Sequence, residues 1–462
     1  MFDTMPGVSM VKKIKTAFYC RNCGHQSPKW LGRCPSCAEW NQFVEEEVGS
    51  SGVGSDLPVG LSEPPLPIDV ITLNDRERIV IGMAEMDHVL GGGIVKGSSI
   101  LVGGDPGIGK STLLLQVLQC LAHKGLTVLY VSGEESARQI KLRGQRIGAS
   151  SERLLIYVET SLDAILRQIE EIKPDVVAID SVQTMYSSRL SSAPGSVGQV
   201  RESSERLILI SKKTGIPIFL IGHVTKDGAI AGPKVLEHMV DAVLYFQGDS
   251  GYAFRIIRGV KNRYGPTNEI GVFEMRDKGL TEVANPSALF LSERPKGAAG
   301  SIVVPSMEGT RPILVEIQSL VSETNFGMPR RTTIGVDHNR VSLLAAVLDK
   351  ICGLHLVNYD IFINVAGGVR LSEPAIDLGI VSALASSFLG RPIDEGTVVC
   401  GEVGLTGEVR GISHMEARIR EAAKMGFTRC VFPKTDAGDT FPKIDMSLIR
   451  ISSLKEMVDT IF

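Results

Sequence analysis

The segment that most constrains this chain is the loop GDPGIGKS at residues 104–111. It matches the pattern GxxxxGK[ST], follows the apolar run ILVGG and precedes the helical pattern STLLLQVLQCLAHKG. A strand, a glycine-rich loop and a helix in this order are typical of a phosphate-binding loop. Further Val/Ile/Leu runs alternate with helical patterns up to about residue 283. This alternation predicts an α/β fold with a mainly parallel sheet covered by helices on both faces.

The loop predicts a site for ATP and Mg²⁺. Its candidate nucleotide-binding residues are Gly104, Asp105, Pro106, Gly107, Ile108, Gly109, Lys110, Ser111 and Thr112. The glycines let backbone amides surround the phosphates, and Lys110 is expected to reach the β- and γ-phosphate oxygens. The Ser111 hydroxyl is expected to ligate Mg²⁺, with Thr112 near the α-phosphate. The motif alone leaves open whether the nucleotide is hydrolysed.

Carboxylates follow two of the predicted strands. Asp180 ends the run VVAID and is the candidate Walker B aspartate. Glu134 follows the run LTVLYVS and is the favoured general base, with Glu135 as the alternative. Either glutamate could instead cap the helix that starts near Ser136.

Two loops could form a nucleic-acid channel. His223 leaves the strand IPIFLIG and is expected to relay γ-phosphate occupancy to the loop that carries Lys226, unless it is a core histidine. A second Ser/Gly-rich loop, residues 185–200, carries Arg189. Flexible, modestly basic loops on one sheet edge suit single-stranded DNA, although each alone is typical of an ordinary surface loop.

Four cysteines near the amino terminus predict a metal site. Cys20, Cys23, Cys34 and Cys37 form two CxxC pairs, the spacing of a structural Zn²⁺ site. A redox role is disfavoured because such a motif would occur once, beside a βαβ unit. Trp30 and Trp40 flank the second pair, and we expect them to pack over it rather than stack on a base.

Composition sets the domain plan of the 462 residues. We expect a zinc finger at 1–43, a Gly/Ser/Pro-rich linker at 44–70, a nucleotide-binding domain at 71–283 and a second α/β domain at 284–462. A net charge of −3 excludes a histone-like polycation but not a local basic groove. The chain has no apolar run that could span a membrane, and its first residues lack the apolar core of a signal peptide. With no disulfide framework indicated by the cysteine spacing, we expect a cytoplasmic protein.

The sequence resembles the bacterial RadA (Sms) family across essentially its whole length. The resemblance rests on the four-cysteine finger, a RecA-type ATPase core, the signature KNRYG and a carboxyl-terminal domain similar to that of Lon protease. The signature residues are Lys261, Asn262, Arg263, Tyr264 and Gly265. The resemblance implies a homo-hexameric, DNA-dependent ATPase motor that drives branch migration of recombination intermediates, with a RecA recombinase as partner. The alternative is a nucleotide-switched DNA-binding scaffold that assists a recombinase without translocating.

The KNRYG segment is predicted to lie at the tip of a hairpin between the runs YAFRIIRGVKN and NEIGVFEMRD. Lys261 and Arg263 are candidates for a finger that acts on a neighbouring subunit's γ-phosphate, and they could also contact a DNA backbone. Tyr264 and Gly265 would shape the turn. A basic, solvated hairpin is the alternative.

The Lon-like domain departs from a protease at two positions. Ala375 stands in the place of the nucleophilic serine, and Arg418 stands in the place of the catalytic lysine. Arginine stays protonated and cannot act as a base, so proteolysis is not expected, although Ser372 lies nearby. We expect an oligomerisation and DNA-binding platform instead. Its candidate phosphate contacts are Arg330 and Arg331, together with Arg311 and Arg340, and an ordinary solvated surface is the alternative for all four.

Overall fold

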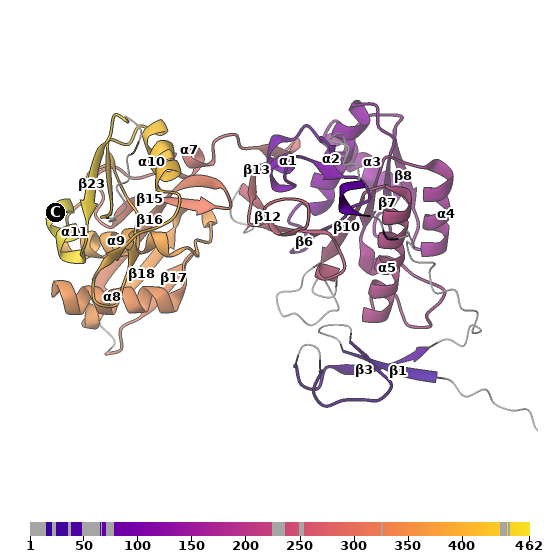
Figure 1. The fold of residues 1–462 in the computed structure, drawn as a ribbon, viewed down its shortest axis with the longest axis horizontal. Helices are drawn as coiled ribbons and strands as arrows, with labels where there is room; N and C mark the ends of the chain where they lie inside the picture. The colour runs from indigo at the N-terminus through magenta and orange to yellow at the C-terminus, as the bar shows by residue number, and fades with distance from the viewer. Residues whose placement is uncertain are drawn as a thin grey trace, which may run out of the picture. The chain divides into compact units, whose positions relative to one another are not determined.

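The computed structural model in Figure 1 describes residues 15–20, 25–35, 38–48, 65, 67–70, 78–223, 236–248, 254–324, 327–434, 441 and 444–462. The chain divides into two compact units. The larger unit comprises residues 1–247 and 256–282, and the smaller comprises residues 248–255 and 283–462. Each unit has its own sheet and its own core.

The first described residues of the larger unit form an antiparallel ribbon in the strand order β2-β1-β3. Its strands are β1 (Lys15–Cys20), β2 (Gln26–Ser27) and β3 (Phe43–Val48). Cys20 pairs with Phe43, and both are buried in one cluster with Cys34. The ribbon extends past the boundary expected at residue 43, because the backbone of residues 44–48 pairs along β1. Part of the expected linker is thus a strand, and a 3-10 turn, η1 (Ile68–Val70), lies near its end.

A nine-stranded sheet forms the core of the larger unit, in the order β14-β13-β12-β11-β6-β10-β9-β7-β8. The strands are β6 (Ser99–Gly104), β7 (Val128–Ser132), β8 (Leu154–Val158), β9 (Val176–Asp180), β10 (Ile218–His223), β11 (Ala242–Gln247), β12 (Phe254–Asn262), β13 (Ile270–Arg276) and β14 (Gly279–Glu282). From β11 to β8 all neighbours are parallel, whereas β11 with β12 and β13 with β14 pair antiparallel. The predicted, mainly parallel sheet is confirmed.

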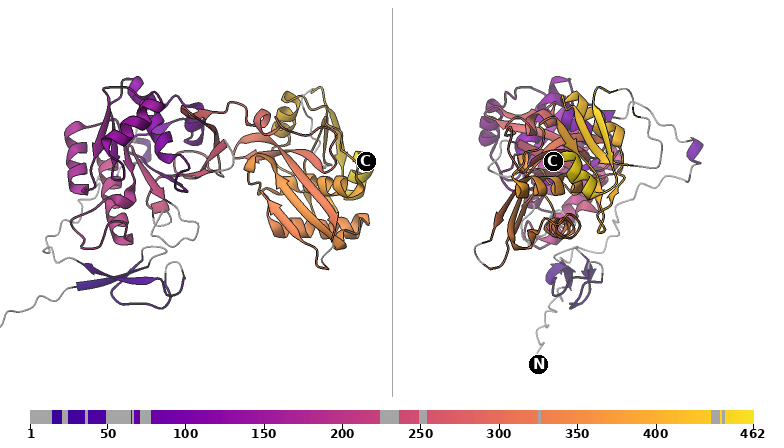
Figure 2. Two further views of the ribbon diagram at one scale, coloured as in Figure 1. Left: turned by 180° about the vertical axis from the view of Figure 1, so that it is seen from behind. Right: turned by 90° about the vertical axis from the view of Figure 1, so that its left-hand side faces the viewer.

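Helices cover both faces of this sheet (Figures 1 and 2). They are α1 (Ala84–Val89), α2 (Lys110–His123), α3 (Ala137–Arg146), α4 (Leu162–Ile172) and α5 (Val197–Thr214). Ile100 and Val102 of β6 belong to the core cluster that includes α2, whereas Leu101 belongs to the cluster that includes α4 and α5. Both sides of each central strand are therefore buried, which explains why these strands are continuous apolar runs.

Polar residues gather at one edge of the parallel strands. His223 pairs with Gly104 across β10 and β6, and Asp180 pairs with Ser132 across β9 and β7. Because these strands are parallel, all four residues end their strands at the same edge. The carboxyl edge of such a sheet is where ligands bind in open α/β folds.

The smaller unit contains a mixed seven-stranded sheet in the order β17-β18-β16-β15-β19-β22-β23. The strands are β15 (Ser301–Glu308), β16 (Arg311–Glu323), β17 (Arg331–Ile334), β18 (Tyr359–Val365), β19 (Thr397–Val399), β22 (Arg429–Pro433) and β23 (Ser447–Ile451). The helices are α7 (Pro286–Phe290), α8 (His338–Cys352), α9 (Asp377–Leu389), α10 (Met415–Lys424) and α11 (Leu454–Ile461). Within the described residues, no helix has the length and apolar character needed to cross a bilayer.

Candidate functional site

The phosphate loop joins β6 to α2 in a conformation that requires glycine. Gly104 has φ 149°, and a Cβ there would lie 2.6 Å from the carbonyl oxygen of Phe246. Gly109 has φ 117° and is crowded by Met275, whose methyl group would lie 2.9 Å from a Cβ. Gly107 has φ 76° and faces open space. The loop is therefore tightly packed where it leaves β6 and where it enters α2, and open between them.

Lys110 lies at the centre of this loop. Its Nζ donates to the carbonyl oxygens of Gly104, at 2.7 Å, and Asp105, at 2.9 Å. Burial lowers the pKa of Lys110, while the carboxylates of Asp180, Glu134 and Asp105 act in the opposite direction. The amine is thus held against its own loop and surrounded by acidic groups.

Asp180 is fixed by a tyrosine that the sequence analysis missed. The hydroxyl of Tyr130, on β7, donates to Asp180 Oδ2, and both side chains are buried. Burial raises the pKa of Tyr130 well above its usual value, and the charge of Asp180 adds to the effect. Asp180 Oδ1 is also buried and has no hydrogen-bond partner among the described residues. The signal in the sequence was the tyrosine hydroxyl in the otherwise apolar run VLYV.

The neighbouring glutamates have different partners. Glu134 is exposed and accepts a hydrogen bond from the hydroxyl of Ser181, whereas Glu135 forms an ion pair with Arg143 of α3. The helix cap considered for these acids is made instead by Ser136, whose side chain accepts from the backbone of Gln139. Glu135 is thus engaged in a structural pair, while Glu134 lies on the same edge as Asp180.

Gly133 allows the turn that carries Glu134 to pack closely against the segment that follows Asp180. Its backbone N–H donates to the carbonyl oxygen of Asp180 at 2.8 Å. A Cβ at Gly133 would lie 2.1 Å from Thr184 Oγ1. The turn that carries Glu134 therefore packs directly against the segment after Asp180.

Of the two loops predicted to contact DNA, residues 185–200 are described, whereas most of the loop after His223 lies outside the described residues. His223 ends β10 beside Gly104, but its side chain and the whole of Lys226 lie outside the described residues. Residues 185–200 are described and are held by Gln199, a fully buried side chain on α5. Its amide donates to the carbonyl oxygens of Ser187, Leu190 and Ser192 and accepts from the N–H of Ser187. The expectation of a flexible segment is therefore corrected, because a buried amide organises it.

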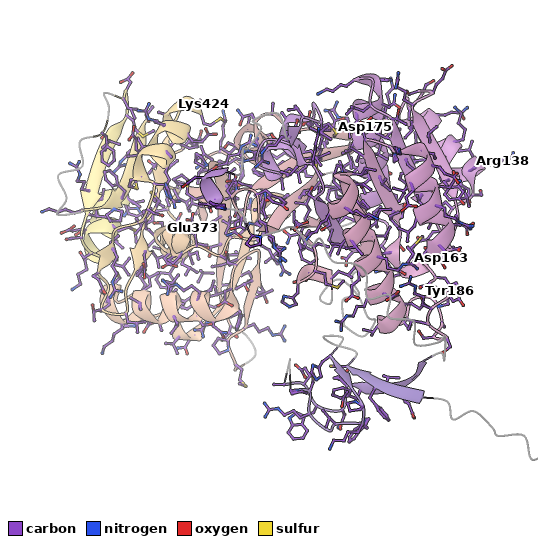
Figure 3. The ribbon with its side chains drawn as sticks, turned by 45° about the vertical axis from the view of Figure 1, so that its right-hand side comes forward. Arg138, Asp163, Asp175, Tyr186, Glu373 and Lys424 are labelled. Atoms are coloured by element: carbon purple, nitrogen blue, oxygen red, sulfur yellow. The ribbon has the colours of Figure 1, made fainter. Side chains whose placement is uncertain are left out.

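Arg189 lies on the surface of this segment. It is exposed, and its guanidinium is 4.0 Å from Glu202 of α5. The same segment is joined to α4, since Ser188 donates to Asp163 at 2.8 Å. Figure 3 labels Asp163 and Tyr186 together at this end of the larger unit. Arg189 is thus presented from an ordered surface.

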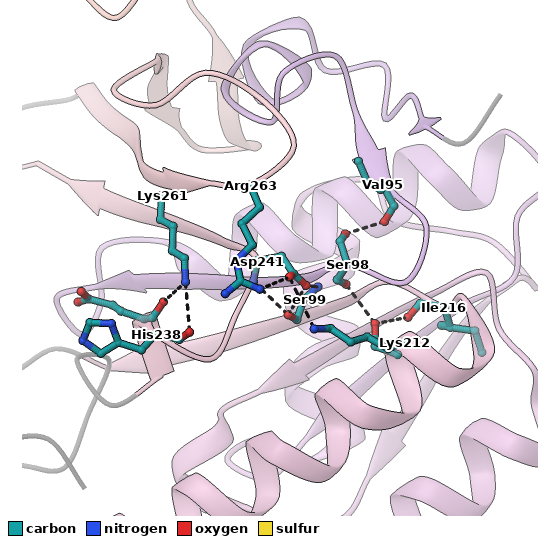
Figure 4. Close-up of polar contacts among 11 residues, drawn as sticks. Val95, Ser98, Ser99, Lys212, Ile216, His238, Asp241, Lys261 and Arg263 are labelled. Atoms are coloured by element: carbon teal, nitrogen blue, oxygen red, sulfur yellow. Dashed lines mark hydrogen bonds and ion pairs between the residues drawn. The ribbon is translucent and has the colours of Figure 1, made fainter. Parts of the chain in front are cut away.

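The KNRYG residues lie at the other end of β6 (Figure 4). Lys261 Nζ donates to the carbonyl oxygen of Glu237 at 2.6 Å, and burial lowers its pKa, with the charge of Arg263 adding to the effect. The guanidinium of Arg263 lies 3.2 Å from the carboxylate of Asp241. Arg263 is nonetheless half exposed, and Tyr264 is 40 % exposed. The segment is anchored, yet both side chains reach the surface.

Asp241 is the buried anchor of this segment. Its Oδ2 accepts from the N–H of Ser99 at 3.0 Å and from the Ser99 hydroxyl at 2.8 Å. Lys212 of α5 adds a second cation, 4.0 Å away. Ser99 is the first residue of β6, and the phosphate loop begins at its last residue, Gly104. With a rise of about 3.3 Å per residue, these two ends are about 16 Å apart.

Neighbouring glycines let the KNRYG turn pack closely. A Cβ at Gly265 would lie 2.9 Å from Asn262 Nδ2 and 3.3 Å from the Cα of Gly91. Asn262 also donates to the carbonyl oxygen of Leu90 at 3.3 Å, and Arg78 donates to that of Tyr264. The predicted hairpin is therefore not a loosely solvated loop.

In the smaller unit, an ion pair occupies the place expected for a protease dyad. Arg418 of α10 is 1 % exposed and donates to both oxygens of Glu373, at 2.7 and 2.6 Å. Its guanidinium also donates to the carbonyl oxygens of Pro305 and Ser413. Figure 3 labels Glu373 among the elements of this unit. Ala375 is buried, and Ser372 is exposed.

The four arginines predicted to contact DNA phosphates differ in their exposure and in the partners that they already have. Arg340 pairs with both oxygens of buried Asp377, so this cation neutralises an internal acid. Arg311 donates to the carbonyl oxygen of Ala284 at 3.1 Å. Arg330 is exposed, and Arg331 is half-buried at the start of β17. Arg330 and Arg331 are therefore better placed than Arg340 for an external phosphate.

Three segments match known sequence families. Residues 18–45 match the rubredoxin metal binding domain, residues 75–229 match the AAA domain, and residues 321–436 match subunit ChlI of Mg-chelatase.

Full-length relatives decide the family. The chain is 52 % identical to "DNA repair protein RadA" of Bacillus subtilis (strain 168), over 97 % of this chain and 99 % of that protein. It is 51 % identical to the protein of the same name in Streptococcus pyogenes serotype M1, over 98 % and 100 % of the two chains. The chain belongs to the RadA family. A solved KaiC-like protein, PH0186 from Pyrococcus horikoshii OT3, aligns with 45 % of this chain and 98 % of its own at 21 % identity and a TM-score of 0.38, too distant to add to the assignment.

Family membership confirms the resemblance inferred from the motifs. The RadA-type chain has a RecA-like P-loop ATPase core, an amino-terminal zinc ribbon and a Lon-like α/β domain at the carboxyl end. The ATPase domain implies ATP with Mg²⁺, and the ribbon implies zinc.

The residues fit both metal ions. Asp180 Oδ1 is a buried acceptor with no hydrogen-bond partner in the described part of the chain, and the Ser111 hydroxyl follows Lys110 on α2. These are the oxygen donors that Mg²⁺ prefers. In the ribbon, Cys20 and Cys34 are buried in one cluster, while Cys23 and Cys37 lie outside the described residues. Thiolates from two CxxC pairs suit Zn²⁺.

Proposed function

We propose that this chain is a DNA-dependent ATPase that assembles into a homo-hexameric ring and drives branch migration of recombination intermediates on single-stranded DNA. The observation that carries the proposal is the separation of two features along β6. The phosphate loop begins at Gly104, whereas the KNRYG residues are anchored through Asp241 at Ser99. Within one chain, the phosphate loop and the KNRYG residues cannot reach the same nucleotide. A neighbouring copy of the chain therefore has to supply the KNRYG residues.

In each proposed site, this chain's own residues bind the nucleotide and prepare the water. Lys110 and the backbone of residues 104–109 bind the phosphates, with Thr112 near the α-phosphate. Asp180 and Ser111 would hold Mg²⁺, which when bound would neutralise charge on the nucleotide phosphates. Glu134 orients and deprotonates the attacking water, and the hydrogen bond from Ser181 supports its choice over Glu135. His223 reports the state of the γ-phosphate to the segment that carries Lys226.

The KNRYG residues would complete the site of the next subunit. Arg263, with Lys261 beside it, would stabilise charge that develops on the γ-phosphate during transfer. Arg263 is half exposed and is held by Asp241. Both features support this role, because a cation that acts on a neighbouring subunit's nucleotide has to be accessible and held in a fixed position.

DNA would lie along surfaces of both units. Arg189 and Lys226 would contact the strand from the ATPase domain, and Arg330 and Arg331 from the Lon-like domain. We further propose that this domain is not a protease, since Ala375 lacks a nucleophile and Arg418 is bound to Glu373. A RecA recombinase would supply the DNA intermediate.

The first experiment is the steady-state ATPase rate with and without single-stranded DNA, across a salt series that reveals phosphate contacts. A motor predicts a DNA-dependent rise that is abolished in Lys110→Ala. Tight ATP-dependent DNA binding with no rise in turnover would favour the nucleotide-switched scaffold.

A mixing experiment tests the shared site. Lys110→Ala and Arg263→Ala are each expected to be inactive alone. Mixed in equal amounts, they should recover about a quarter of the wild-type rate, because one in four head-to-tail interfaces then pairs an intact loop with an intact finger. No recovery in demonstrably mixed oligomers would contradict action between subunits.

A further inference from the structure

Tyr130 lies where no packing argument requires a hydroxyl. It is a fully buried residue of β7 and belongs to the core cluster that includes α2. Phenylalanine would fill the same apolar space. The hydroxyl therefore needs another explanation, since a buried O–H is costly unless it finds a partner.

The partner of this hydroxyl is one particular oxygen of Asp180. Tyr130 donates to Oδ2, while Oδ1 stays buried and has no hydrogen-bond partner among the described residues. The two oxygens of the carboxylate are thus made unequal. The tyrosine occupies one of them and leaves the other for a ligand.

Strand pairing holds the two side chains in register. Tyr130 pairs with Ala178 on β9, and Ser132 pairs with Asp180 two residues further on. Residues two apart on a strand point to the same side of the sheet, so the phenol reaches the carboxylate along one face. Both strands are fully buried, which leaves little freedom for either side chain.

The hydrogen bond also fixes the rotation of the carboxylate. Tyr130 donates to Oδ2 of Asp180, and both side chains are buried between covered faces of the sheet.

We propose that Tyr130 is a positioning residue of the nucleotide site, which holds Asp180 through Oδ2 so that Oδ1 is presented to Mg²⁺ or its water ligands. This inference rests on the proposed role of Asp180. Tyr130 touches neither nucleotide nor metal.

The test is Tyr130→Phe, with Tyr245→Phe as the matched control. Tyr245 lies on β11 of the same sheet, and its hydroxyl donates to Glu237 at 2.6 Å. The primary readout is binding of a fluorescent, non-hydrolysable ATP analogue to the full-length protein as Mg²⁺ is titrated. The second readout is the binding of Mn²⁺ in the presence of that analogue, measured by electron paramagnetic resonance.

Tyr130→Phe is expected to raise the Mg²⁺ concentration for half-maximal binding by about tenfold or more, the size expected from loss of one hydrogen bond to a charged group. Binding of the analogue without Mg²⁺ should be unchanged, and Tyr245→Phe should behave as wild type. In an Asp180→Asn background, Tyr130→Phe should add no further shift, because the tyrosine acts through Asp180.

Three outcomes separate the alternatives. An unchanged Mg²⁺ requirement with a lower unfolding temperature would make Tyr130 a purely structural residue and overturn the inference. An equal shift in both single tyrosine variants would overturn it too, because the effect would not be specific to Asp180. If Asp180→Asn itself leaves the Mg²⁺ requirement unchanged, the proposed role of Asp180 fails, and the inference fails with it.

Discussion

Buried carboxylates in this chain lie beside donors from distant parts of the sequence. Asp241 accepts from Ser99, Asp377 from Arg340, and Asp180 from Tyr130. An acid taken out of water requires such a partner, because a buried charge without one is strongly destabilising. At the residue scale, these contacts show which substitutions will change function and which will change stability.

Asp241→Asn tests the anchor of the KNRYG segment. The amide keeps the shape but removes the charge that holds Arg263, so DNA-stimulated ATPase should fall while binding of MgATP is retained. Stability should fall by about 1–3 kcal/mol, as for loss of one partner of a buried hydrogen-bonded group. The measurements are ATPase rate, nucleotide binding and chemical unfolding.

Asp175→Asn is the matched control, since Asp175 also precedes a parallel strand and accepts from a backbone N–H, that of Thr127. An equal loss of stimulation in both variants would show that the effect is not specific to Arg263.

Glu373→Gln tests the ion pair of the Lon-like domain. It leaves the buried guanidinium of Arg418 without a counter-charge and should cost about 3–5 kcal/mol in the free energy of unfolding. Glu416→Gln on α10 breaks only an exposed pair with Arg420, so it should cost less than about 1 kcal/mol. Equal costs in urea unfolding would mean that burial of Arg418 does not decide the result.

At the scale of elements, turns place the catalytic candidates. Gly133→Ala should displace the turn that carries Glu134, because its Cβ would meet Thr184 at 2.1 Å. We expect kcat for ATP hydrolysis to fall at least tenfold, about 1.4 kcal/mol in the barrier, with nucleotide binding retained. The control is Gly144→Ala in α3, where the nearest atom would be 3.6 Å away and a helix favours alanine. A normal kcat in Gly133→Ala would exclude this turn from catalysis.

The elements themselves were readable from the sequence, whereas many of their polar pairings were not. The strand before the phosphate loop, the helix after it and the hairpin around KNRYG follow local patterns of apolar and turn residues, and the structure has them. Tyr130 was hidden because a tyrosine in an apolar run resembles any core aromatic. Asp241 was hidden because an aspartate before a strand resembles a turn residue. Their partners are 50 and 142 residues away, and local periodicity carries no information about such contacts.

At the scale of the whole molecule, the zinc ribbon can be followed separately. The chain has two tryptophans, Trp30 and Trp40, and both lie in the ribbon. They flank Gly32 and are 51 % and 63 % exposed, so the expected packing over the second CxxC pair is at most partial. Intrinsic tryptophan fluorescence therefore reports on this part of the chain alone.

Removal of zinc should unfold the ribbon and leave the ATPase core intact. A small domain depends on its metal for folding, so a strong chelator should shift tryptophan emission and release one zinc per chain. Binding of MgATP should be unchanged, because the phosphate loop belongs to a separate core cluster. Parallel loss of nucleotide binding would show instead that the ribbon and the core fold as one.

The pair formed by Arg418 and Glu373 also has an evolutionary consequence. Changing either residue alone leaves the other charge uncompensated, and Arg418 further serves two backbone carbonyl groups. Introducing a lysine base here would therefore require coordinated changes at several positions, with unstable intermediates between them. In any lineage that carries this pair, selection for a stable domain opposes a change to peptidase chemistry, even where no selection acts on peptidase activity itself.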